Sequence, residues 1–128
     1  PKAVISFIRT HHGRGKAKYF YNSFKNQYPD KPINDELFTY PGPNPFSKET
    51  AVLMMADSVE AASRSLKEHT EESISALVNK IIDGQIADGL LKSAPLTFKD
   101  VETIKSVFVD KLKTMFHTRI SYPDLKKQ

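Results

Sequence analysis

Residues 70–86, TEESISALVNKIIDGQI, decide the fold class of this chain. The segment opens on Thr70 and two glutamates, which is typical of a helix N-terminus, because a hydroxyl caps the first turn and carboxylates face the positive end of the helix dipole. Apolar side chains then recur by steps of three and four residues, the spacing of one buried helix face. They are Ile74, Leu77, Val78, Ile81, Ile82 and Ile86. The segment predicts an amphipathic helix that weakens between residues 84 and 89.

Four other segments show helical spacing, and no segment alternates convincingly with the two-residue period of a strand. We expect these helices at residues 1–12, 16–28, 47–67 and 97–120. Gly13 suits a C-terminal cap, Ser47 an N-cap, and Thr97 with Asp100 a capping box. We therefore predict an all-α helical bundle of about five helices, with residues 123–128 as a solvated tail.

The composition narrows the class of protein further. At 128 residues the chain is one domain or part of one, and its start at Pro1, directly in a helix, predicts an excised portion of a longer domain. The net charge of +4 comes with lysines spread along the chain, so a solvated surface or a site for a phosphate-bearing ligand fits better than duplex nucleic acid. The absence of cysteine excludes disulfides and thiolate zinc sites, and no apolar run is long enough to cross a membrane.

Two adjacent histidines, His11 and His12, are the first candidates for chemistry, since neutral imidazole is a common ligand of transition metals. Consecutive helical residues diverge by about 100°, so both rings can face one site only where the helix ends, as expected before Gly13. The alternative is that one ring caps the helix C-terminus, where its protonated form is favoured. His69 and His117 stand in polar surroundings and are expected at the surface.

Asp57 is the third candidate, because the expected helix 47–67 is apolar around it, with Met54 and Val59 close by in sequence. A buried carboxylate needs a partner. That partner is either a metal ion shared with the histidine pair, or a cation such as a lysine or Arg64.

Residues 38–46, FTYPGPNPF, contain three prolines and a glycine, which exclude a helix and stiffen the loop. The loop is either an ordinary connector or an ordered cover over a ligand site, with Phe38 and Tyr40 as its aromatic side chains. Tyr40 is the better candidate for stacking on a base. Neither a GxSxG nor a GxxxxGK[ST] motif is present, so the common serine hydrolases and P-loop nucleotide triphosphatases are excluded.

Three strings then occur together and in order: IRTHHG at 8–13, KYFYNSF at 18–24, and FTYPGPNPFSKETAVLMMADSVEAASRS at 38–65. In this combination the chain resembles the bacterial seven-transmembrane receptors with an intracellular HD hydrolase domain, a family of cyclic di-AMP phosphodiesterases. The resemblance is detailed over residues 1–65 and looser beyond. It implies that residues 1–128 are the C-terminal portion of an HD-domain helical bundle. That domain would lie in the cytoplasm as part of a bacterial inner-membrane protein, and this portion would be soluble.

The resemblance also implies a chemistry. The family domain holds two divalent transition-metal ions, iron or manganese, which activate a bridging water for attack on phosphorus. On the family pattern His11, His12 and Asp57 are metal ligands, and Tyr40 and Arg64 are substrate-side residues. The family also requires an earlier histidine, a His-Asp dipeptide and a further histidine before His11, and this chain contains none of them. We therefore expect the chain alone to hold metal weakly and to hydrolyse little.

Two alternatives stay open: another HD-type nucleotide phosphohydrolase, and a helical interaction module without catalysis. HD-GYP enzymes acting on cyclic di-GMP fit less well, because HHG is not followed by a glutamate and a GYP triplet. Membrane contact would occur only through segments outside this chain. A missing part of the domain would also leave apolar side chains such as Phe7 and Phe20 exposed, which predicts a homo-oligomer through that face.

Overall fold

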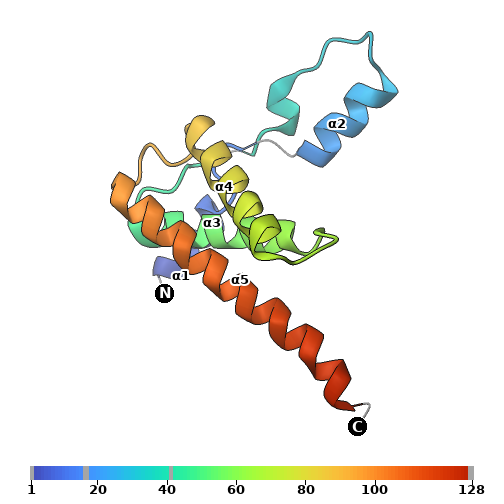
Figure 1. The fold of residues 1–128 in the computed structure, drawn as a ribbon. Helices are drawn as coiled ribbons and strands as arrows, with labels where there is room; N and C mark the ends of the chain where they lie inside the picture. Colours follow the sequence, from blue (N-terminus) through green and yellow to red (C-terminus); the bar gives the residue numbers. More distant parts are fainter. Residues whose placement is uncertain (1, 16–17, 41, 127–128) are drawn as a thin grey trace.

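The structure is a computed structural model that describes residues 2–15, 18–40 and 42–126 (Figure 1). Within these ranges it contains five α-helices and one short 3-10 helix, and no strand element. The elements are α1 (Lys2–Thr10), α2 (Lys18–Gln27), η1 (Asp35–Phe38), α3 (Lys48–Ser63), α4 (Glu71–Ala87) and α5 (Phe98–Lys126). The predicted all-α class and number of helices are confirmed.

The body of the molecule is formed by α3, α4 and α5, which pack against one another, and α1 packs on α3 (Figure 1). The apolar face predicted for α4 points into this body except at Ile86, which is exposed. Burial of apolar side chains from all three helices drives the association. The buried apolar side chains of this body include Ala51, Met54, Met55, Val59, Ile74, Val78, Ile82, Val101, Leu112 and Phe116.

The helix starts follow the predicted capping residues. Ser47 and Thr70 each accept a hydrogen bond from the backbone N–H three residues on, at 3.1 Å in both cases. At the start of α5, the Asp100 carboxylate accepts from the Thr97 backbone N–H at 3.0 Å, and Lys48 Nζ lies 3.2 Å from the same oxygen. These two contacts, the Thr97 bond first, hold the pKa of Asp100 below its ordinary value.

Two predicted helix ends are wrong. Helix α3 stops at Ser63 rather than near residue 67, because a tight turn follows in which Leu66 N–H donates to the Ser63 carbonyl at 3.2 Å. Helix α5 continues through Lys126 instead of ending near residue 120, so residues 123–126 are helical rather than a tail. Pro123 lacks one main-chain N–H donor, but the carbonyls before it can still accept hydrogen bonds from later residues, so the helix can continue past it. Residues 127–128 lie outside the described part.

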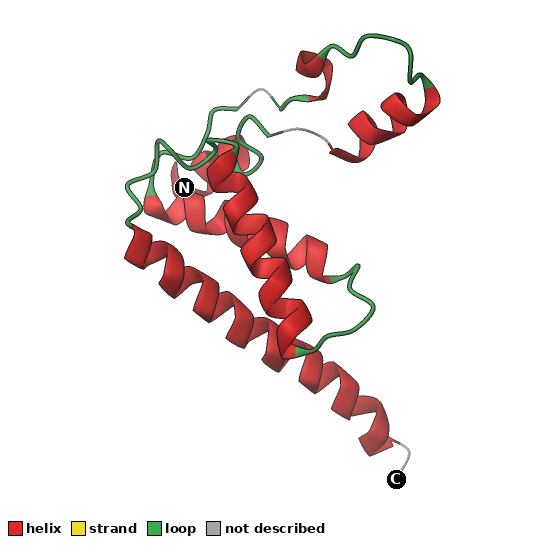
Figure 2. Cartoon of the chain, turned by 45° about the horizontal axis from the view of Figure 1, so that its top comes forward, coloured by secondary structure: helices red, strands yellow, loops and turns green. Residues whose placement is uncertain are grey.

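Helix α2 and η1 form an arm that stands away from the body (Figure 2). Among the described elements, α2 packs against η1 and no other. Their aromatic side chains hold the arm together: Phe38 lies edge-on to Tyr21 and tilted against Phe24, with ring centroids 5.7 Å apart in both pairs. Phe38 therefore belongs to the packing of the arm, which favours the connector interpretation for this side chain.

The outer face of α1 carries exposed apolar side chains, with Val4, Ile5 and Ile8 exposed by 53%, 57% and 62%. The side chains of Phe7 and Phe20, which were expected to be exposed, lie outside the described part. None of the helices in the described ranges is both long and apolar enough to pass through a bilayer.

Candidate functional site

The histidine pair lies in the turn that ends α1. Gly13 adopts a φ of +54°, and its N–H donates to the Thr10 carbonyl at 2.9 Å, which closes the helix end as predicted. The turn frees His11 and His12 from regular helical spacing, and their ring centroids lie 4.0 Å apart. The two imidazoles are thus brought to one place.

The proline-rich loop is bonded directly to this turn. Asn44 Oδ1 accepts a hydrogen bond from the Arg14 backbone N–H at 2.8 Å, and the Tyr40 N–H donates to the Gly15 carbonyl at 2.9 Å. The approach is close, since a Cβ on Gly13 would meet Asn44 Oδ1 at 2.6 Å. The loop therefore forms a wall of the site.

The rings of both histidines are held by neighbours. His11 Nδ1 lies 2.9 Å from the Ile8 carbonyl oxygen, which can only accept, so Nδ1 carries the hydrogen of this bond. Metal-binding histidines are commonly oriented in this way. His12 stacks on Tyr40, with centroids 4.1 Å apart and ring planes at 10°. Burial and the neighbouring His11 lower the pKa of His12, while Asp57 acts in the opposite direction.

Asp57 does not lie where the sequence placed it. Its side chain is exposed, because the buried face of α3 runs through Ala51, Met55 and Val59, and Asp57 points away from that face. The carboxylate therefore stays hydrated and does not need a partner for burial. Arg64 is also exposed, and its guanidinium binds Glu60, with Nε 3.0 Å from Oε1, so Glu60 rather than Asp57 is its ion-pair partner.

A metal site is not complete within the described residues. Among residues 2–15, 18–40 and 42–126, no three histidine, cysteine or acidic side chains lie close enough together to hold a metal ion. The chemistry of the paired imidazoles suits a transition metal. The ligand role of His11, His12 and Asp57 stays a prediction.

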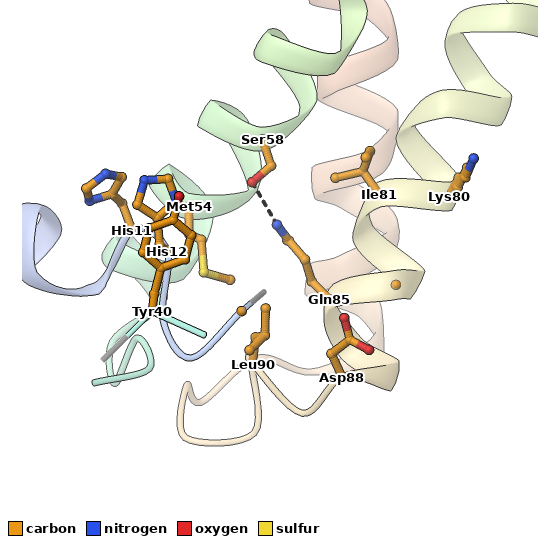
Figure 3. A pocket seen from close by; sticks show the side chains of 12 residues that line it. His11, His12, Tyr40, Met54, Ser58, Lys80, Ile81, Gln85, Asp88 and Leu90 are labelled. Carbon is orange, nitrogen blue, oxygen red and sulfur yellow. Dashed lines mark hydrogen bonds between the residues drawn. The ribbon is translucent and has the colours of Figure 1, made fainter. Parts of the chain in front are cut away.

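A cavity of about 390 Å³ opens beside the histidine pair (Figure 3). The cavity is lined by the turn that ends α1, the proline-rich loop, α3, α4 and the segment after α4. The lining residues are His11, His12, Gly15, Tyr40, Met54, Ser58, Lys80, Ile81, Gly84, Gln85, Asp88 and Leu90. Tyr40 is therefore in the cavity wall, whereas Arg64 is not among the lining residues.

Sequence reasoning missed the polar contact that spans this cavity between α3 and α4. Gln85 Nε2 donates to Ser58 Oγ at 2.9 Å (Figure 3). The available signal is the break in the apolar stripe of α4, where Gly84 and Gln85 precede Ile86. Such a break marks the point at which a helix face stops serving the core.

The two other histidines differ from each other. His69 is half-buried, its ring stacks on Phe116 with centroids 3.7 Å apart, and Nε2 lies 3.2 Å from the Ser63 carbonyl oxygen. The prediction of a surface position is wrong for His69, because the turn after α3 folds it back onto α5. His117 is exposed, as predicted.

The class of protein follows from comparison of this helical arrangement with solved structures. The chain matches no protein-family model. The crystal structure of the Listeria monocytogenes phosphodiesterase PgpH HD domain in complex with cyclic di-AMP superposes with a TM-score of 0.83 and 32% sequence identity, over 90% of this chain and 53% of that one. A second crystal structure of that domain gives a TM-score of 0.82 and 31% identity. The fold is that of an HD domain.

Two particular relatives are named as cyclic di-AMP phosphodiesterases, and the chain is homologous to them. It is 41% identical over 128 residues to cyclic-di-AMP phosphodiesterase PgpH of Bacillus subtilis, and 35% identical over 126 residues to that of Listeria monocytogenes. It spans 18% and 17% of the length of these two proteins, and about half of the solved HD domain, 53%.

Proposed function

We propose that this chain forms part of a metal-dependent phosphodiesterase site that hydrolyses cyclic di-AMP in the full-length protein. The observation that supports this most strongly is the convergence of the His11 and His12 rings, 4.0 Å apart, in the wall of a cavity of about 390 Å³. The homologous HD domain of Listeria monocytogenes was crystallised in complex with the same cyclic dinucleotide.

His11, His12 and Asp57 would supply ligands for two transition-metal ions, iron or manganese. The bound ions would supply a nucleophilic hydroxide at neutral pH and stabilise charge on the phosphate. The two imidazoles and the tautomer of His11 fit this role. Asp57 is exposed on the neighbouring helix α3, and its charge acts on His12. The remaining ligands would come from the part of the HD domain that the chain does not span.

Tyr40 and Arg64 are proposed on the substrate side with different support. Tyr40 lines the cavity and stacks on His12, so a ligand seated beside the histidines would touch its side chain. Arg64 is held by Glu60, and it would have to exchange that carboxylate for a phosphate of the substrate.

We propose, as the family resemblance implies, that the site lies in the cytoplasmic domain of a bacterial membrane protein. The chain spans 18% and 17% of two bacterial relatives, so the anchoring segments would lie in the length that it does not span. The exposed face of α1 formed by Val4, Ile5 and Ile8 supports self-association, since clustered apolar side chains favour contact between protein surfaces.

The test measures metal content and hydrolysis in the full-length protein. We expect the purified protein to contain iron or manganese. We also expect it to convert cyclic di-AMP to a linear dinucleotide, which chromatography of the reaction products would detect. His11→Ala and His12→Ala should each lose metal and about a hundredfold or more in kcat/KM. His117→Ala is the matched control, because His117 is exposed and does not line the cavity. A protein without transition metal and without hydrolysis, or full metal content in both variants, would overturn the proposal.

A further inference from the structure

Gln85 carries a polar atom that the fold leaves unsatisfied. Its Nε2 donates to Ser58 Oγ at 2.9 Å, but Oε1 is buried and accepts no hydrogen bond from any residue that the structure describes. Within the described ranges it is the one buried side-chain nitrogen or oxygen in this condition. Buried acceptors are almost always paired, and an exception calls for a missing partner such as a water or a ligand. Gln85 lines the cavity beside the histidine pair, so a ligand there can supply that partner once the amide turns and brings the enclosed Oε1 to the cavity surface.

Gly84 gives a second, independent sign that the cavity is built for an occupant. It lies inside α4, where glycine is less favourable than alanine. Packing within the described part of the chain does not require it, because a Cβ at this position would meet none of the described atoms within 4 Å. Gly84 lines the cavity, so the missing side chain enlarges the space available to a ligand rather than relieving a contact in the protein.

The walls of the cavity suit a flat heterocycle. Met54 and Ile81 contribute apolar surface, and Ser58 and Gln85 contribute hydrogen-bonding groups. The volume of about 390 Å³ lies in the range of small-molecule sites. Apolar surfaces that hold the faces of a ring, with an amide at its edge, are the usual means by which proteins read a base.

We infer that this cavity receives one adenine of the cyclic dinucleotide and that Gln85 Oε1 accepts a hydrogen bond from the exocyclic amino group. The inference rests on the proposed function. Ser58 binds Nε2 and so leaves Oε1 as the end of the amide for the ligand, and the broad last side-chain torsion of glutamine allows Oε1 to turn toward the base. A 6-oxo purine would place a second acceptor against Oε1, and this unpaired contact would exclude it. Gln85 is thus the specificity-determining residue and Ser58 its positioning residue.

The test compares binding of two ligands that differ at position 6 of the purine: the phosphorothioate analogues of cyclic di-AMP and cyclic di-IMP. Titration calorimetry of the full-length protein should show a preference for the adenine compound of about five- to a hundredfold. Gln85→Leu should reduce the preference to about twofold or less. Ser58→Ala should also reduce it, because the amide can then turn and donate Nε2 to a 6-oxo group. Asn79→Leu, on the exposed side of α4 outside the cavity, is the control that keeps the preference.

A further variant tests the cavity itself. Gly84→Leu should abolish binding of both compounds while the melting temperature stays the same or rises, since leucine favours a helix more than glycine does. Unchanged affinity in Gly84→Leu, or an unchanged preference in Gln85→Leu, would overturn the inference and leave the proposed function standing. A wild-type protein that binds neither compound would overturn the proposed function and the inference with it.

Discussion

The ring of Tyr40 stacks on the ring of His12, with centroids 4.1 Å apart and planes at 10°. This contact joins the proline-rich loop to the turn that ends α1, and both residues line the same cavity. The Tyr40 N–H donates to the Gly15 carbonyl at 2.9 Å, so backbone and side chain hold the loop in the same place. The stack therefore gives the loop a defined position beside the proposed metal ligands.

Loss of the stack should weaken both the fold and the site. Tyr40→Ala is expected to lower the free energy of unfolding by about 0.5–1.5 kcal/mol in addition to the lost buried area, which is the typical contribution of an aromatic pair. Tyr40→Phe keeps the ring and should stay within about 0.5 kcal/mol of the wild type. Urea unfolding of the two variants measures the difference. Equal stabilities of the alanine and phenylalanine variants would contradict a stabilising role of the stack.

Gly13→Ala should be strongly destabilising, and Gly84→Ala should not. At Gly13 the φ of +54° is unfavourable for alanine, and the new Cβ would approach Asn44 Oδ1 to 2.6 Å. We expect a loss of about 1–3 kcal/mol in the free energy of unfolding.

The matched substitution in α4 changes the same atoms in a helical position with open space around it. Gly84→Ala should raise the free energy of unfolding by about 0.5–1 kcal/mol. Denaturant titration of both variants under one condition provides the comparison. An unchanged or higher stability of Gly13→Ala would show that the turn at residue 13 does not depend on glycine.

The free energy of unfolding should depend on pH through Asp100, at the start of α5. Its pKa is lowered in the folded state, first by the Thr97 backbone N–H and then by Lys48. The contribution to stability is therefore complete above the pKa of the unfolded chain, about 3.9, and is lost as the pH falls through the lower folded value. Asp100→Ala should be less stable than the wild type at pH 6, and the gap should close toward pH 2.

A second variant separates the two causes of this shift. Lys48→Met removes the ammonium but leaves the Thr97 bond, so most of the pH dependence should remain. Urea unfolding between pH 2 and pH 7 follows all three proteins. A gap between wild type and Asp100→Ala that does not change with pH would exclude the carboxylate as its source.

Substitution of Ile82 should lower the stability strongly, since this side chain is fully buried between the helices of the body. Ile82→Ala is expected to lower the free energy of unfolding by about 2–5 kcal/mol, through lost apolar burial and the cavity left behind. Leu37→Ala provides the contrast, because Leu37 is 77% exposed in the arm and should change stability by less than about 0.5 kcal/mol. Similar losses in the two variants would mean that the arm is as strongly packed as the body.

The helices, their starts and the turn at Gly13 could be predicted from the sequence because each depends on neighbours within a few residues. Ser47, Thr70 and Thr97 cap the first turn of their own helices, and Gly13 closes the end of α1 through a bond to Thr10. The proximity of His11 and His12 follows from that same turn. These features are local, so side-chain chemistry and backbone geometry suffice to predict them.

The direction of each helix face was decided by the tertiary structure. Asp57 follows two buried methionines in sequence, yet it is exposed, because consecutive residues of a helix point about 100° apart and the packing partners of α3 choose the buried face. The positions of Phe38 and His69 also depended on packing between elements. Phe38 packs on Phe24 of α2, and His69 stacks on Phe116 of α5.

The cavity required the tertiary structure most of all. Ser58 and Gln85 meet at 2.9 Å from separate helices, and Tyr40 reaches His12 from a separate loop. No local pattern encodes these distances, because they depend on how α1, α3, α4 and the loop pack together. The sequence by itself determined the helices and the paired imidazoles. The packing of those helices decided which side chains share a site with them, because contact between distant segments depends on the relative placement of whole elements.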